Sequence, residues 1–250
     1  MSEMPFFSII VPTYNRPRRL ASCLRALADL DYPRDQYEVI VVDDGSVQSS
    51  EEMVASFADK ICVQYVYQEN QGPAVARNNG ARMANGRFLA FTDDDCVPSA
   101  SWLHQLASQL ISEPQKMVGG YTRNALSRNP FSITSQLLID YLYHHFNRTE
   151  SRARFFTSNN FVVSADLFWQ VGGFDETMPL AAGEDREFCD RWLESGFGMI
   201  YLPRAVIFHA HKLGIRSFWR QHFNYGRGAW HYRALRSQRT ATAVQLESPK

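Results

Sequence analysis

The sequence has few cysteines and no long apolar run, and each shortage excludes a class of protein. Its 250 residues include four cysteines, Cys23, Cys62, Cys96 and Cys189, which lie far apart without a CxxC pair. This spacing excludes a zinc–cysteine site and predicts reduced thiols in a cytoplasmic protein. No stretch reaches the roughly 18 apolar residues that cross a bilayer, and the N-terminus lacks the pattern of a secretion signal. We therefore expect a soluble protein, or one attached peripherally at the inner face of a membrane.

Acidic residues are missing from one long stretch near the C-terminal end. Lys and Arg number 26 in the whole chain and so do Asp and Glu, yet residues 204–239 contain eight basic residues and no acidic one. This asymmetry predicts an anionic partner for that end of the chain. Nucleic acid is not expected as the partner, because no helix-turn-helix or RNA-binding signature accompanies the charge.

Short apolar runs alternate with helical patterns through the first half of the chain. Runs rich in β-branched and aromatic residues predict strands covered on both faces, at residues 6–11, 38–44, 61–67 and 87–94. Between them, leucines recur at helical spacing after Pro17, and a second helical segment spans Ala74 to Ala84. This alternation predicts an α/β protein with a mostly parallel, Rossmann-like sheet flanked by helices.

Polar sequence follows three of these strands, as VPTYNR (11–16), VVDDGS (41–46) and FTDDDC (91–96). Ligands of such sheets bind beyond the carboxyl ends of the strands, so the three segments should meet at one crevice. The triplet Asp93, Asp94 and Asp95 is unfavourable unless a cation or many donors lie among the carboxylates. Hard carboxylate oxygens favour Mg²⁺ or Mn²⁺ as that cation.

These segments, with QENQGPAVARNNG (68–80), GGFDE (172–176) and GEDREFCDRW (183–192), occur in the order found in the inverting glycosyltransferases of family 2. The chain resembles that family over roughly residues 7–230. The resemblance implies a GT-A fold and transfer of a sugar from a nucleotide diphosphate donor, with UDP-sugar favoured, to a hydroxyl of a glycan or lipid-linked saccharide. Two alternatives stay open: a sugar-phosphate nucleotidyltransferase, although the glycine-rich loop of those enzymes is missing after the first strand, and a non-catalytic sugar-nucleotide-binding protein.

The resemblance also assigns residues to the donor. The VPTYN loop would pack on uracil and ribose, Asp43 or Asp44 would accept the imide hydrogen of uracil or thymine, and Asp93 would reach the ribose. Asp94 is expected to point elsewhere. The residues predicted to contact the donor are Pro12, Tyr14, Arg16, Asp43, Asp44, Gly72, Arg77, Asp93 and Asp94.

The same resemblance implies a metal site. Asp95 is the predicted ligand for Mn²⁺ or Mg²⁺, and His209 or His211 of the segment VIFHAH would complete the site. His209 is the first choice. An imidazole ligand favours Mn²⁺ over Mg²⁺.

Inversion requires a base that takes the proton of the attacking hydroxyl. Asp185 matches the position of this base in the family, and Glu184 is the neighbour expected to contact acceptor or donor sugar. Both are expected in the exposed first turn of a helix, whose N-terminus keeps a carboxylate ionised. Asp175 and Glu176 are the next candidates for the base.

The chain is predicted to divide into three parts: a nucleotide-sugar-binding half (1–125), an acceptor-binding and catalytic half of the same domain (126–214), and a basic, aromatic, helical tail (215–250). In the second part, Asn159 and Asn160 are expected to hydrogen-bond hydroxyls of the donor sugar.

The tail leaves three interpretations open. Arg220 or Arg227 would bind the diphosphate over the active site, or the tail would attach to an anionic membrane, or its arginines would only cover apolar surface. Residues 240–250 are predicted to form a disordered end.

Overall fold

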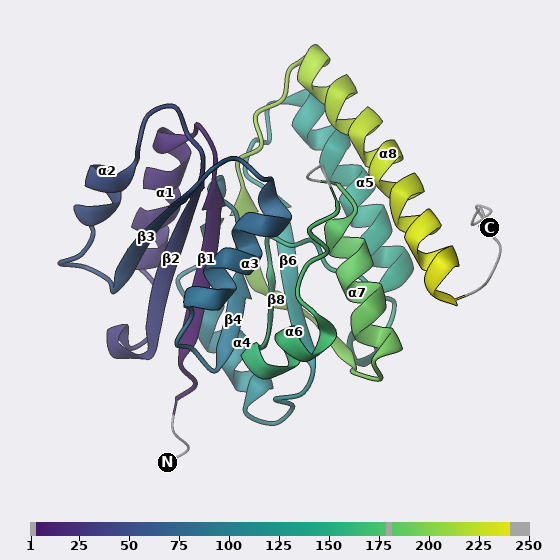
Figure 1. Ribbon diagram of the computed structural model, residues 1–250, viewed down its shortest axis with the longest axis horizontal. Coiled ribbons are helices and arrows are strands. Elements are labelled where there is room, and N and C mark those ends of the chain that lie inside the picture. Colours follow the sequence, from purple (N-terminus) through teal and green to yellow (C-terminus); the bar gives the residue numbers. More distant parts are fainter. Residues whose placement is uncertain (1–3, 179–181, 241–250) are drawn as a thin grey trace.

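The computed structural model describes residues 4–178 and 182–240, and one sheet of eight strands runs through it (Figure 1). The strand order is β3-β2-β1-β4-β7-β6-β8-β5. The predicted disordered end lies, except for Thr240, outside the described residues. The strands are β1 (Phe7–Thr13), β2 (Tyr37–Asp44), β3 (Val63–Gln68), β4 (Phe88–Phe91), β5 (Cys96–Pro98), β6 (Met117–Asn124), β7 (Phe161–Ser164) and β8 (Met199–His209).

The first four strands of this order pair in parallel, as the alternation of strand and helix predicts. Beyond β4 the sheet is mixed, because β7 pairs antiparallel with both β4 and β6, while β6 and β8 are parallel. The mostly parallel α/β sheet is therefore confirmed. The predicted boundary near residue 125 falls within this continuous sheet.

Helices cover both faces of the sheet. On one face, α1, α2 and α4 pack against alternate strand residues such as Ile9 and Val41. On the other face, α3, α5, α6 and α7 enclose a core rich in phenylalanine. The helices are α1 (Pro17–Ala28), α2 (Glu51–Ala55), α3 (Pro73–Met83), α4 (Trp102–Leu110), α5 (Pro130–Phe146), α6 (Ala165–Val171), α7 (Glu184–Glu194) and α8 (Ile215–Thr240), with short 3₁₀ turns at Arg34–Gln36 and Glu150–Arg152.

Two predictions about the strands need correction. β3 is an edge strand whose residues are mostly half-exposed or exposed, so it is not covered on both faces. Its apolar side chains include Tyr67, which is 59% exposed. β4 ends at Phe91, so the acidic triplet lies in the turn after the strand and not within it.

The C-terminal helix α8 packs along α5 and α7 (Figure 1). Phe131 of α5 and Phe218 of α8 have ring centroids 5.6 Å apart. Within the described ranges, no helix has the length and hydropathy that a membrane crossing requires. The predicted helical tail is thus present in residues 215–240, where it packs on the outer side of α5 and α7.

Candidate active site

The loops that follow β1 and β2 meet at one edge of the sheet. Thr13 and Asp43 are register partners at the ends of the two strands. The amide of Asn15 donates to Ser46 Oγ at 2.7 Å, and the amide of Val47 donates to Asn15 Oδ1 at 2.9 Å. Asn15 lies in the left-handed region with φ of 55°, a conformation that asparagine tolerates better than most residues. The predicted meeting of these strand ends is confirmed.

Asp94 also reaches this edge, where it lies between β1 and the first helix. Its carboxylate accepts from Thr13 Oγ1 at 2.8 Å and from Arg16 Nη1 at 3.2 Å. Burial raises the pKa of Asp94 to about 6, although the charge of Arg16 acts in the opposite direction. Asp94 thus holds Arg16, whose Nη1 also lies 3.5 Å from Asp95 Oδ2, and Asp94 does not line the cavity described below. Its donor contact stays a prediction.

Asp95 lies among cations. Arg19 Nη1 donates to its Oδ2 at 2.7 Å, and His209 Nε2 lies 3.1 Å from its Oδ1. Burial would raise the pKa of Asp95, but the hydrogen bond from His209 and the charges of His209 and Arg16 outweigh burial and hold the pKa well below its usual range. Asp95 is therefore an ionised carboxylate, as a metal ligand must be.

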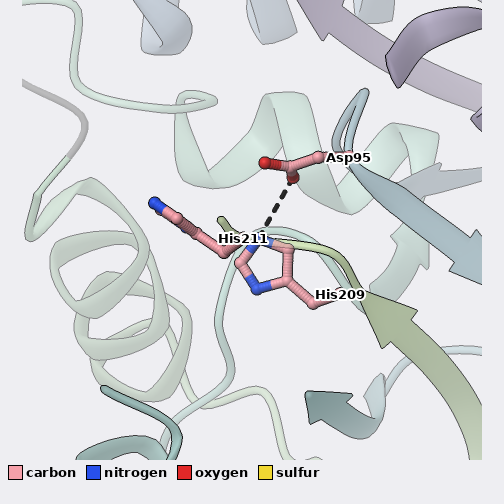
Figure 2. Close-up of side chains that lie close together, drawn as sticks. All are labelled: Asp95, His209 and His211. Atoms are coloured by element: carbon pink, nitrogen blue, oxygen red, sulfur yellow. Dashed lines mark ion pairs between the residues drawn. The ribbon is translucent and has the colours of Figure 1, made fainter. Parts of the chain in front are cut away.

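Asp95, His209 and His211 form a cluster that fits a divalent cation (Figure 2). One ligand atom from each lies within 4.8 Å of the others. Ligands at about 2.1 Å from a shared ion lie at most about 4.2 Å apart, so a small rotation of a side chain would bring all three onto one ion. Burial and the neighbouring His209 lower the pKa of His211 to about 4, which leaves its imidazole neutral and able to donate a lone pair. One carboxylate oxygen and two imidazole nitrogens suit Mn²⁺ better than Mg²⁺.

Asp93 is linked to the far side of the site through a buried arginine. Arg77 Nη2 donates to Asp93 Oδ1 at 2.8 Å, and Arg77 Nη1 donates to Glu184 Oε1 at 3.1 Å. Arg77 is 3% exposed, so it is not a surface residue of α3. This arginine connects the end of β4 with the start of α7, two segments far apart in the sequence.

Glu184 and Asp185 begin α7, and their surroundings correct the predicted exposed turn. Glu184 is buried, and its Oε2 has no hydrogen-bond partner among residues 4–178 and 182–240, while Asp185 is half-buried. Burial and the charge of Glu184 raise the pKa of Asp185 to about 7, although the amide of Arg186 donates to its Oδ1 at 2.7 Å. The helix N-terminus therefore does not keep this carboxylate at an ordinary pKa.

Helix α8 contributes to this burial. Gly228 of α8 lies against the backbone of Ala182, with no space for a Cβ atom, and a Cβ on Gly183 would lie 2.9 Å from the carbonyl oxygen of Gly228. The close approach of two backbones brings α8 over the first turn of α7. Tyr225 of α8 lines the same space, and burial raises its pKa to about 12.

A cavity of about 1060 Å³ joins the metal-ligand cluster to the start of α7. Its wall continues between α5, α7 and α8, where apolar side chains such as Leu142 and Phe155 alternate with polar ones. The predicted site residues that line it are Arg16, Arg77, Asp93, Asp95, Asn159, Glu184, Asp185, His209 and His211.

The remaining donor residues lie beside the cavity and not in its wall. Tyr14 is 48% exposed at the end of β1, so it is not a core aromatic. Asp43 accepts from Tyr65 Oη at 2.7 Å and from the amide of Ser46 at 2.9 Å, which leaves acceptor capacity on both oxygens. Asp44 organises the start of α3: it accepts from Gln68 Nε2 and from the amides of Gln71 and Gly72 at 2.7, 2.8 and 2.9 Å. Pro12, next to Tyr14, is half-exposed at the same strand end.

Several expectations about the second half do not match the geometry. Asn160 is wholly buried, and its amide binds Trp102 and the carbonyls of Tyr121 and Ala205, so it cannot reach a sugar. Asp175 and Glu176 lie outside the cavity wall. Arg220 and Arg227 are exposed and do not line the cavity, which removes the predicted diphosphate contact.

Sequence reasoning missed the cationic partner Arg19 and the cavity residues of α8. Arg19 lies three residues after Arg16, on the same side of the first turn of α1, and that spacing could have indicated it. Gln221 and Tyr225 are hydrogen-bonded to each other at 2.6 Å and line the cavity. Their position depends on how α8 docks, and nothing local in the sequence shows that.

Comparison with known proteins agrees with this arrangement. A family model described as glycosyl transferase family 2 matches residues 8–172. Validoxylamine A glucosyltransferase of Streptomyces hygroscopicus subsp. jinggangensis is 31% identical over 227 residues, which cover 79% of this chain and 54% of that protein. Glycosyltransferase AglE of Haloferax volcanii is 29% identical over 212 residues, which cover 83% of this chain and 68% of that protein. The chain thus spans between about half and two thirds of the length of these two relatives.

Solved structures share the fold. Mannosyltransferase PcManGT of Pyrobaculum calidifontis, in complex with GDP-Man and Mn²⁺, superposes with a TM-score of 0.76 at 21% identity, covering 99% of this chain and 67% of that one. TarS of S. aureus (residues 1–349), in complex with UDP-GlcNAc, gives a TM-score of 0.68 at 23% identity, covering 84% of this chain and 59% of that one. The predicted GT-A fold is confirmed by these likenesses. Because the family model matches well over half of its residues, the chain belongs to glycosyltransferase family 2.

Proposed function

We propose that the protein is a metal-dependent, inverting glycosyltransferase that moves a sugar from a UDP-sugar to a hydroxyl of a glycan or lipid-linked saccharide at the cytoplasmic side of a membrane. The observation that carries this proposal is one cavity with a divalent-cation cluster at one end and a carboxylate of pKa about 7 at the other. A binding protein without catalysis has no need of such a carboxylate.

The donor would lie along the strand ends. Tyr14, whose ring is exposed, would pack on the base, and Asp43, although its side chain is buried, would accept the imide hydrogen of uracil with its remaining lone pairs. The TarS complex with UDP-GlcNAc supports uracil, whereas the PcManGT complex with GDP-Man keeps guanine as the competing base. Asp95, His209 and His211 would hold Mn²⁺. When bound, this ion would neutralise charge on the departing diphosphate.

Asp185 would act on the acceptor. As the acceptor oxygen forms its bond to the anomeric carbon and the bond from that carbon to the diphosphate breaks, the hydroxyl proton passes to Asp185. A carboxylate with pKa near 7 is a stronger base than an exposed one, and about half of it is ionised at neutral pH. Arg77 would hold Asp93 and Glu184 in place on either side of the reacting atoms.

A thermal-shift series with UDP, GDP and TDP, each with Mn²⁺ or with EDTA, tests the donor and the metal together. We expect UDP with Mn²⁺ to give the largest rise in melting temperature, because a ligand at 100 times its Kd stabilises the fold by about 2.7 kcal/mol. Equal shifts in EDTA would remove the metal from the proposal. A larger shift with GDP would replace uracil by guanine as the donor base.

A further inference from the structure

The outward face of α8 carries large apolar side chains that no other part of the described chain covers. Ile215, Trp219, Phe223 and Trp230 are 59%, 68%, 69% and 61% exposed. At about 100° per residue these four positions fall within an arc of about 80°, and they extend over about 22 Å of helix. We call them the apolar stripe. A continuous exposed apolar surface of this kind marks a contact site, because isolated exposed residues are normal but aligned ones are not.

A row of cations borders the apolar stripe on one side. Arg216, Arg220 and Arg227 follow the stripe around the helix within about a further 60°. All three are exposed, and none has a carboxylate within ion-pair distance in the parts of the chain that the structure describes. We call them the arginine row.

Two other arginines of α8, Arg236 and Arg239, behave differently. Arg239 pairs with Glu187, Asp190 and Glu194 of α7 at 2.6, 3.0 and 2.7 Å. Arg236 lies 3.3 Å from Asp190. Arg236 and Arg239 thus hold α8 against α7, whereas the arginine row makes no such contact with the described residues.

We propose that this face of α8 binds the surface of a membrane that contains anionic lipids. The apolar stripe would enter the boundary between headgroups and acyl chains, where tryptophan is preferred, and the arginine row would lie at the phosphates. An amphipathic helix with aromatic residues on one face and arginines beside them suits this position in the plane of the membrane. The inference goes beyond the proposed transfer reaction and does not depend on it.

Charge distinguishes this partner from a second copy of the chain. Residues 204–239 contain no acidic residue, so two such faces in contact would bring two arginine rows together without a carboxylate from either α8. Like charges in a buried contact are unfavourable. An anionic lipid surface supplies the missing negative charge at every position along the helix.

Sedimentation with vesicles tests the proposal on the whole chain. We expect the protein to sediment with vesicles of phosphatidylcholine and phosphatidylglycerol, and to stay in solution with vesicles of phosphatidylcholine alone. Changing Arg216, Arg220 and Arg227 to Gln should weaken binding on the order of 100-fold, since each cation near an anionic surface contributes about a factor of five. A variant in which Arg25, Arg34 and Arg87 become Gln loses the same charge elsewhere and should bind like the unmodified protein.

The apolar stripe is tested by changing Trp219, Phe223 and Trp230 to Ser. We expect vesicle binding to be lost, while Tyr67→Ser, which removes one exposed aromatic from the edge strand β3, leaves it intact. An unchanged circular dichroism spectrum and melting temperature would show that each variant is folded. Equal binding to neutral and anionic vesicles, or unchanged binding in both triple variants, would overturn the proposal. So would a dimer in sedimentation velocity that the Ser variant converts to monomer, since the face would then be a self-contact.

Discussion

Asp95 and Asp185 line the same cavity, yet their surroundings move their pKa values in opposite directions. At one end, His209 and Arg16 hold the pKa of Asp95 far below its usual range despite burial. At the other, burial and the charge of Glu184 raise the pKa of Asp185 to about 7. The comparison shows how neighbouring charges set the pKa of a buried carboxylate: among cations it stays ionised and suits a metal, and beside another carboxylate its pKa rises to a value that suits a base.

The largest effect is expected at the base. Asp185→Asn should lower sugar transfer by roughly 100- to 10,000-fold, the usual contribution of general-base catalysis, and leave UDP affinity nearly unchanged. Initial rates and UDP titrations on the same preparation measure both. Asp31→Asn, on the surface outside the cavity, serves as the matched control and should transfer at the normal rate. Near-normal transfer by Asp185→Asn would show that the base is another group.

At the other end of the cavity, a change of Asp95 should affect the binding of UDP. Asp95→Asn should reduce Mn²⁺-dependent UDP affinity by about 100-fold or more, because loss of a residue that merely supports a metal ligand already costs about 10- to 100-fold. Titration of UDP with Mn²⁺ and with EDTA would measure it, and Asp59→Asn on the surface is the control. If Mn²⁺ still tightens UDP binding to the same degree, the cluster of Figure 2 is not the metal site.

A third test concerns the packing of α8, which helps to bury Asp185 but not Asp95. Gly228→Ala would place a methyl group against the backbone of Ala182, which should cost about 1–3 kcal/mol of stability as α8 is displaced. Gly226→Ala, in the same helix with open space around it, is the control and should be neutral or slightly stabilising. Chemical denaturation measures both. Equal stabilities would mean that the close backbone contact is unimportant.

The smallest effect concerns pH. Protonated Asp185 cannot accept a proton, so transfer should fall as the pH drops below about 7 and rise towards a plateau above it. In Glu184→Gln the like charge is gone, so the pKa of Asp185 falls and the midpoint of this acid limb should move to lower pH. Profiles of kcat/KM against pH give both midpoints. A shift to higher pH would mean that Glu184 does not repel the base.

Sequence patterns were sufficient for the features that depend on neighbours along the chain. The strand-end motifs, the helices after Pro17 and at 73–83, and the identity of Asp95, His209 and Asp185 as candidates came from local sequence and from the family resemblance. What could not be predicted depends on docking. The burial of Asp185 depends on the contact between Gly183 and Gly228. The buried position of Asn160 depends on its hydrogen bond with Trp102, which belongs to α4. The sequence likewise does not show which arginines of α8 face α7 and which face outward, because this depends on how the helix docks.

The position of α8 in the chain also affects the order in which the site is completed during synthesis. The strand-end loops and the metal-ligand cluster use residues up to His211, all of which are synthesised before α8. Chains grow at about 5–20 residues per second, and their N-terminal parts begin to fold first. Until α8 docks, the first turn of α7 lacks the cover of that helix, so the burial that raises the pKa of Asp185 is incomplete. The surroundings that raise the pKa of the proposed base are therefore completed after the metal-ligand cluster, when α8 packs over the start of α7.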